Sequence, residues 1–132
     1  MLLYHATYRA RLAGIKEGGL GAHPIKNWGI SEPGVTYLCS DPDAAFSFCE
    51  VAEDVSDSVY ESGIVVLAVS SKYLDKDKLS LDANYHEDGS GPRCFVYKGV
   101  IPASQLMVVT IRGLKGFLLN MRRVLSYENS RE

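Results

Sequence analysis

The feature that most constrains the fold is an uninterrupted apolar run at positions 64–69, Ile-Val-Val-Leu-Ala-Val. A strand with one face in water alternates apolar and polar residues, and this run does not alternate. Unbroken apolar character is typical of a strand that is covered on both faces. We therefore predict a central, fully buried strand at this position.

Shorter patterns on either side predict a small α+β domain. Asp41 before Pro42 is a helix start, because aspartate caps the first turn and proline suits the first helical position. The pair Gly18-Gly19 is a typical helix terminator. We predict strands at 2–6, 35–39, 94–97 and 107–111, helices at 9–17 and 42–55, a turn-rich loop at 20–34, an irregular polar stretch at 72–88, and a short strand or helix within 114–125.

Composition narrows the class of protein. The 132 residues, 46% hydrophobic and 23% charged, predict one globular domain, 1–132. The net charge is −2 and the basic residues are scattered, so we do not expect a nucleic-acid partner. No apolar run reaches the ~20 residues of a membrane span, and no signal peptide is recognisable. We expect a cytoplasmic protein, a monomer or weak dimer, without a membrane partner.

The cysteines and histidines do not form a recognisable metal pattern. Three cysteines are an odd number with no C-x-x-C pair, which argues against a disulfide framework and for a reducing compartment. The three histidines have no ligand spacing relative to them, so we predict no metal site. A Cys/His nucleophile pair stays open, although small buried thiols explain Cys39, Cys49 and Cys94 more simply.

A few residues are candidates for a binding site, each with a plainer alternative. His5 lies in an apolar strand, followed by Ala6 and Thr7, so nearby backbone groups could meet a planar polar ligand. The alternative is a core histidine. Tyr37 and Phe46 could accept a heteroaromatic ring between them, or simply pack in the core.

An acidic segment could supply a carboxylate where positive charge develops, although such segments are usually only solvated. Its members are Asp75, Asp77, Asp82, Glu87 and Asp88.

Three segments together resemble ADP-ribosyltransferase domains of the diphtheria-toxin and poly-ADP-ribose polymerase type. Leu-Leu-Tyr-His-Ala-Thr at 2–7 is similar to their opening Leu-Leu-(Trp/Phe)-His-Gly-Thr strand. Gly-Val-Thr-Tyr-Leu-Cys-Ser at 34–40, with Ala-Ala-Phe at 44–46, is similar to their second motif. Cys-Phe-Val-Tyr at 94–97 resembles their third, Glu-Tyr-Ile-Val-Tyr. The resemblance implies a split β-sheet core and NAD as co-substrate, with no metal.

The resemblance implies a role for each residue that matches one of the family's site residues. His5 would bond a ribose hydroxyl, the Ala6 backbone would hold the nicotinamide carboxamide, and Thr7 would contact the ribose. Tyr37 and Phe46 would enclose the nicotinamide ring. Ser40 would also contact the cofactor, and Arg9, with Arg11, would reach the pyrophosphate.

One position departs from the family. Arg93 stands where polymerase-type relatives carry their catalytic glutamate. The acid could instead come from the preceding segment, as in rifampin-modifying relatives, with Asp82 the first candidate, Glu87 the second and Asp88 a third. Two alternatives are an enzyme like the RNA 2′-phosphotransferases and a binding module, of a phage or mobile-element type, without catalysis.

The resemblance thus implies transfer of ADP-ribose to a macromolecule, a protein rather than a nucleic acid, with release of nicotinamide. Free-standing domains of this size in the family are often toxins, antibiotic-modifying enzymes or viral inhibitors of host defence. The loops 20–34 and 56–62 would select the acceptor, with Trp28 as a contact.

Overall fold

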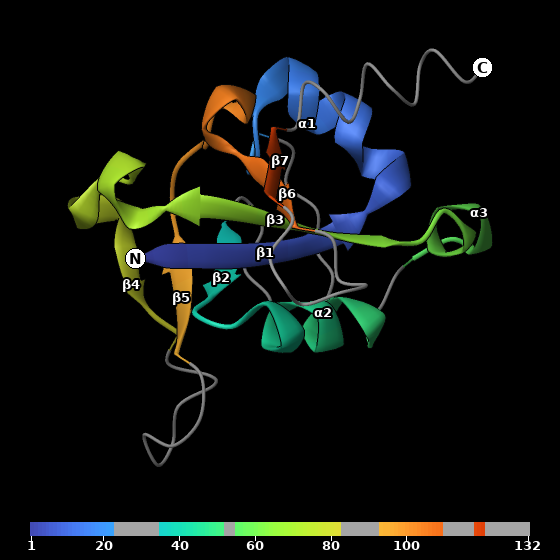
Figure 1. Ribbon diagram of the computed structural model, residues 1–132, viewed down its shortest axis with the longest axis horizontal. Helices are drawn as coiled ribbons and strands as arrows, with labels where there is room; N and C mark the ends of the chain where they lie inside the picture. Colours follow the sequence, from blue (N-terminus) through green and yellow to red (C-terminus); the bar gives the residue numbers. More distant parts are fainter. Residues whose placement is uncertain (23–34, 52–54, 83–92, 110–117, 121–132) are drawn as a thin grey trace.

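The computed structural model describes residues 1–22, 35–51, 55–82, 93–109 and 118–120. They form an α+β fold around one antiparallel sheet, whose seven strands lie in the order β4-β5-β2-β1-β3-β6-β7 (Figure 1). The strands are β1 (Leu2–Tyr8), β2 (Thr36–Cys39), β3 (Ile64–Ser70), β4 (Leu79–Leu81), β5 (Cys94–Tyr97), β6 (Met107–Val109) and β7 (Leu118–Asn120).

The helical segments are short. They are α1 (Leu12–Gly18), α2 (Pro42–Glu50) and α3 (Asp57–Glu61), with single 3-10 turns η1 (Arg9–Arg11), η2 (Ser71–Tyr73), η3 (Lys76–Lys78) and η4 (Ala103–Gln105). None of these described helices is both long and apolar enough to cross a membrane.

Each face of the sheet carries its own apolar cluster. The first cluster joins Leu3 and Leu67 of the sheet to Leu12 and Ile15 of α1. The second cluster joins Ala6 and Val66, among others, to Ala45 and Cys49 of α2. In Figure 1, α1 lies above the sheet and α2 below it. The sheet is therefore covered on both sides, and we call these sides the α1 face and the α2 face.

The central strand is confirmed. Residues 65–69 of β3 are all buried, and β3 lies between β1 and β6. Burial on both faces removes the apolar surface of these side chains from water, at ~25 cal/mol per Å². This strand therefore supplies much of the apolar contact that holds the two layers together.

Local signals also placed the helix ends. The Asp41 carboxylate accepts a hydrogen bond from the Ala44 backbone N–H at 3.2 Å, so α2 begins where predicted. Gly19 follows α1 with φ 89°, and a Cβ there would meet the Ile101 carbonyl oxygen at 2.8 Å. Only glycine fits this turn, because it combines a left-handed backbone with a close approach.

Several predicted bounds were wrong. Helix α2 ends at Glu50 rather than near 55. The segment 72–88, predicted to be irregular, contains η3 and β4, and the predicted loop 56–62 contains α3, capped by the Ser56 hydroxyl. These elements are too short to show a hydrophobic period in the sequence. Pairing with a neighbouring strand and capping of the helical turns therefore determine where they form. Strand β7 falls within the predicted 114–125 segment, whose other residues lie outside the described ones.

Candidate functional site

The three segments that resemble the ADP-ribosyltransferase motifs are neighbouring strands. They form β1, β2 with the start of α2, and β5, and the sheet order places β5, β2 and β1 side by side. Their residues are separated by up to about ninety positions in the chain, so sequence spacing alone could not require this. The segments therefore share one region of the sheet.

Within that region, the ladder between β1 and β2 is nearly absent. It contains a single residue pair, Tyr4 with Cys39. On its other edge β1 pairs with β3 over seven consecutive residues. Beyond Tyr4 the two strands do not continue in register, and we call the interval between them, from His5 to Ala6 on β1 and at Tyr37 on β2, the gap.

The His5 side chain bridges the gap. Its Nδ1 lies 2.8 Å from the backbone oxygen of Tyr37. A carbonyl oxygen can only accept, so Nδ1 carries the proton and Nε2 keeps a lone pair that can accept a hydrogen bond. Burial lowers the pKa of His5; the carbonyl bond opposes this shift, and Arg11 adds to it. The imidazole is therefore neutral at pH 7.

Backbone alternation shows which groups face the gap. The Ser40 N–H donates to the carbonyl of Arg93, the residue before β5, so the backbone N–H and C=O of residue 40 point toward β5. Those of residues 39 and 37 therefore point toward β1. Tyr4 pairs with Cys39, so the backbone groups of Tyr4 point toward β2. The backbone groups of Ala6, two positions further on, point the same way. The N–H and C=O of Ala6 are thus directed at the gap.

The side chains divide between the two faces. His5 lies opposite Leu67 of the first cluster, and Thr7, which is buried, lies opposite Val65 of the same cluster. Tyr37 alternates with Leu38, a first-cluster residue, and so leaves the sheet on the α2 face.

Tyr37 and Phe46 therefore lie on the same face, where Phe46 packs against the second cluster. A ring slot between them stays a prediction. We also expected His5 and Tyr37 to line one slit between the first two strands, and this expectation is wrong, because their side chains leave the sheet on opposite faces. They meet at the sheet plane, through the imidazole and the Tyr37 carbonyl.

Asp82 follows β4 and continues the sheet. Its N–H donates to the Cys94 carbonyl at 2.9 Å. The pKa of the Cys39 thiol is raised, first by its hydrogen bond with Cys94 and by burial, and also by the Asp82 carboxylate. Asp82 therefore faces the thiols, two strand spacings or ~10 Å from Cys39. Among the predicted acids, Glu87 and Asp88 lie outside the described residues, as does Trp28.

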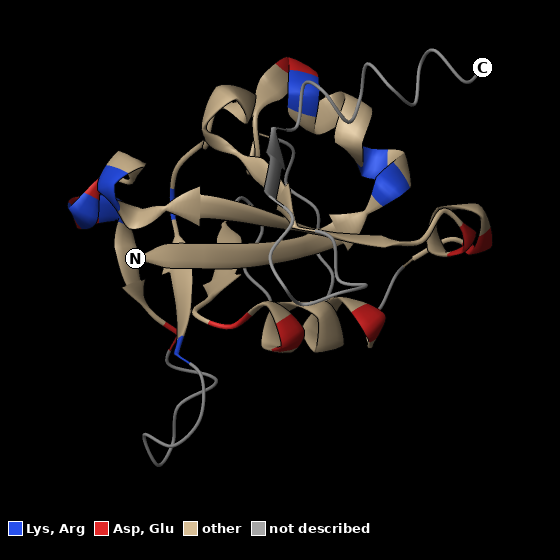
Figure 2. Ribbon diagram, in the orientation of Figure 1, with Lys and Arg blue, Asp and Glu red and all other residues tan. Residues whose placement is uncertain are grey.

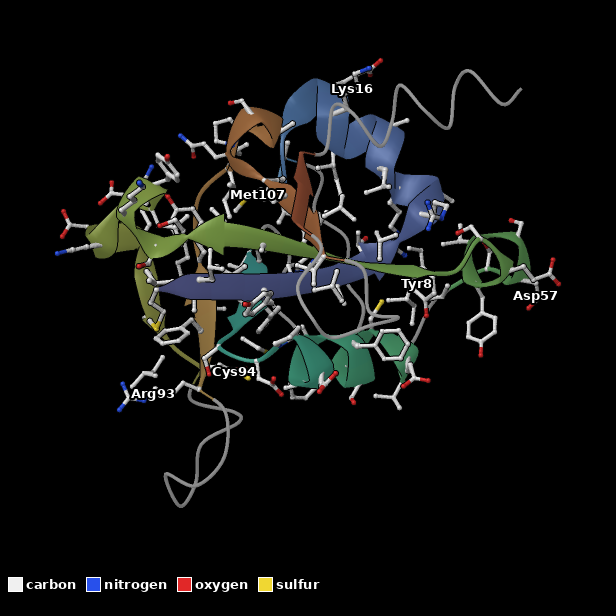
Figure 3. The ribbon with its side chains drawn as sticks, in the orientation of Figure 1. Tyr8, Lys16, Asp57, Arg93, Cys94 and Met107 are labelled. Carbon is white, nitrogen blue, oxygen red and sulfur yellow. The ribbon has the colours of Figure 1, made fainter. Side chains whose placement is uncertain are left out.

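The remaining predicted residues are spread around the sheet. The Ser40 hydroxyl accepts the Arg93 N–H at 2.9 Å and so fastens β2 to β5. The exposed Arg93 side chain points away from the fold (Figure 3). Arg9 lies beyond the far end of β1, and the Arg11 guanidinium lies 5.6 Å from the centre of the Tyr8 ring.

Acidic residues line α2 and α3 (Figure 2). Basic residues lie from η1 into α1 and on η2 and η3, each time with an acid nearby, and also at Arg93 and Lys98. Among the described residues, no three metal-ligating side chains come together. The absence of a metal stays a prediction.

All three cysteines are buried thiols, as the sequence predicted. The sequence did not predict that Cys39 and Cys94 lie opposite each other, with sulfurs 3.0 Å apart. The available signal was that Cys39 ends one predicted strand and Cys94 begins another.

The chain matches no family model, no curated protein and no solved structure.

Proposed function

We propose that this protein transfers ADP-ribose from NAD to a protein acceptor and releases nicotinamide. One observation carries the proposal: where the β1–β2 ladder stops, the His5 imidazole donates to the Tyr37 carbonyl. These residues belong to the first two segments of the family resemblance, and the third forms the adjacent strand. The interrupted ladder also supports the finer fold proposal, a split sheet of the ADP-ribosyltransferase type.

The gap suits the nicotinamide end of NAD. A carboxamide has one donor and one acceptor group in a plane, and the Ala6 N–H and C=O, directed at the gap, are their complement. Tyr37 and Phe46 lie on the α2 face, where Ala6 also packs. An aromatic face next to a positively charged pyridinium gains a cation–π attraction of ~1 kcal/mol or more when water is excluded.

His5 would orient the adjoining ribose. Its neutral Nε2 can accept a hydrogen bond from a ribose hydroxyl, which a protonated imidazole could not do. The lowered pKa of His5, caused by burial, keeps that acceptor available at pH 7.

The chemical step breaks the bond between the ribose carbon and the nicotinamide nitrogen. The electron pair stays with nicotinamide, which becomes neutral, and positive charge spreads over the ribose carbon and ring oxygen. A carboxylate held nearby stabilises this charge by ~3–4 kcal/mol, which is about a hundred- to thousandfold in rate. Asp82 is our candidate because it lies on the Tyr37 side of the sheet. The acceptor's nucleophile then attacks the ribose carbon.

The position of Arg93 favours a second candidate, an NAD-binding module without catalysis. Arg93, directly before the third-motif strand, is an exposed cation, and a cation cannot stabilise the positive charge that glycosidic cleavage produces. In this alternative the gap binds NAD or a partner, and the NAD is not cleaved.

The test measures nicotinamide release from NAD by the purified protein with cell lysate as the source of acceptor. We expect Asp82→Asn to lower the rate about a hundredfold or more, because the stabilising charge is lost. Asp57→Asn is the matched control, since Asp57 is an exposed acid on α3, in a different part of the fold.

Thermal unfolding with and without NAD separates the alternatives. NAD at 100 times its dissociation constant should stabilise the fold by ~2.7 kcal/mol. Stabilisation without nicotinamide release would support the binding module. If NAD causes no stabilisation and no nicotinamide is released, the gap is not an NAD site.

A further inference from the structure

Cys39 and Cys94 form a cross-strand thiol pair that the proposed NAD chemistry does not use. They are register partners on β2 and β5, and their Sγ atoms lie 3.0 Å apart. Both are buried, with 4% and 2% of their surface exposed. A close pair of thiols on two strands 55 positions apart in the chain is a geometry that a disulfide can use.

The backbone already has the spacing of a bridged pair. The Ser40 N–H donates to the Arg93 carbonyl, and the Asp82 N–H donates to the Cys94 carbonyl. The backbone N–H and C=O of Cys94 therefore point toward β4, and those of Cys39 point toward β1. The two cysteines are therefore a non-hydrogen-bonded pair, whose Cα atoms lie ~4.5 Å apart in antiparallel sheets. Disulfides span Cα separations from ~4.4 Å upward, so bridging requires little backbone movement.

We propose that Cys39 and Cys94 are a redox-modification site, at which a peroxide forms a reversible disulfide that ties β2 to β5. Hydrogen peroxide is small and uncharged, which suits a buried pair. The proposal does not depend on the proposed function, and each can fail separately.

The reaction balances with one peroxide. The Cys94 thiolate attacks a peroxide oxygen, the O–O bond breaks, and the departing oxygen takes a proton to leave as water. Cys39 sulfur then attacks the resulting sulfenic acid, the S–O bond breaks, and a second water leaves. Two thiols and one hydrogen peroxide give one disulfide and two waters.

Electrostatics assigns the order of attack. The hydrogen bond from the Cys39 thiol lowers the pKa of Cys94, although burial and the Asp82 carboxylate oppose it. The same contact raises the pKa of Cys39. Cys94 therefore ionises first. Burial raises the pKa of the third thiol, Cys49, to about 11, so this residue is a natural control.

The experiment treats the full chain with hydrogen peroxide, removes the oxidant, and alkylates the unfolded protein. We expect one alkylated cysteine in place of three, a linked peptide pair containing Cys39 and Cys94, and full reversal by dithiothreitol. The oxidised chain should melt roughly 10 °C higher, because a long loop is closed in the unfolded state.

Variants make the result specific. Cys49→Ser should form the same bridge, whereas Cys39→Ser and Cys94→Ser should form no bridge within the chain. Three alkylated cysteines after peroxide treatment would overturn the proposal. So would a bridge to Cys49 or to a second chain, or oxidation of Cys94 to a sulfinic acid while Cys39 stays a thiol.

Discussion

The two edges of β1 differ more than any other neighbouring parts of the sheet. Toward β3, seven residue pairs lie in register and both faces are covered. Toward β2 there is one pair, and a side chain occupies the place of the next ladder contact. The β3 edge of this strand therefore stabilises the fold, whereas its β2 edge leaves backbone groups outside the ladder.

The comparison is sharpest at one register position. His5 of β1 and Leu67 of β3 are opposite each other on the α1 face. Leu67 is almost wholly buried, while His5 is partly exposed and turns toward β2. If the two edges have separate purposes, substitutions at these neighbours should act on different measurements.

The largest expected effect is on stability. Leu67→Ala should lower the free energy of unfolding by ~3 kcal/mol, because it leaves a cavity in the first cluster. Urea unfolding measures this loss. Leu81→Ala is the control, since Leu81 is 58% exposed and its truncation should change stability by at most ~0.5 kcal/mol. Equal losses in the two variants would show that β3 does not dominate the fold.

A smaller stability effect and a clear functional one are expected for His5→Phe, which keeps a ring but has neither a donor nor an acceptor. Losing the bond to the Tyr37 carbonyl should cost ~1 kcal/mol of unfolding free energy. Nicotinamide release should fall ~10- to 100-fold, since the ribose loses its acceptor. The two assays are run on the same preparation. A variant that loses stability as Leu67→Ala does, yet keeps full turnover, would place His5 in the core instead.

The smallest expected effect is a pH dependence. Burial lowers the pKa of folded His5 below the value of 6.5 for the unfolded chain. As pH falls below about 6.5, the unfolded chain binds a proton that the fold resists, so stability decreases until pH reaches the folded pKa. Above that window the contribution is complete.

Urea unfolding at about pH 7.5 and about pH 5.5, for wild type and His5→Phe, measures this difference. The wild type should lose more stability on acidification than the variant. Other groups titrate in both proteins and cancel in the comparison. Parallel losses would mean that His5 is not held neutral by the fold.

Some of this arrangement could be predicted from the residues, and some could not. The cap at Asp41, the glycine after α1 and the buried strand at 64–69 depend on neighbours in the chain, and all three are confirmed. Strand β4 was missed because three residues carry no period, and pairing with β5 defines it. The side on which Tyr37 leaves the sheet depends on register, which no local pattern encodes.

The sequence by itself determined the α+β class, the start of α2, the end of α1 and the strand that must be buried, because capping, backbone freedom and apolar burial act over a few residues. Tertiary structure alone decided that β1 would have a full ladder on one edge and a gap on the other. It also brought the Cys39 and Cys94 sulfurs to 3.0 Å. The physical reason is that strand order and register are set by the packing of the whole sheet between its two covering layers.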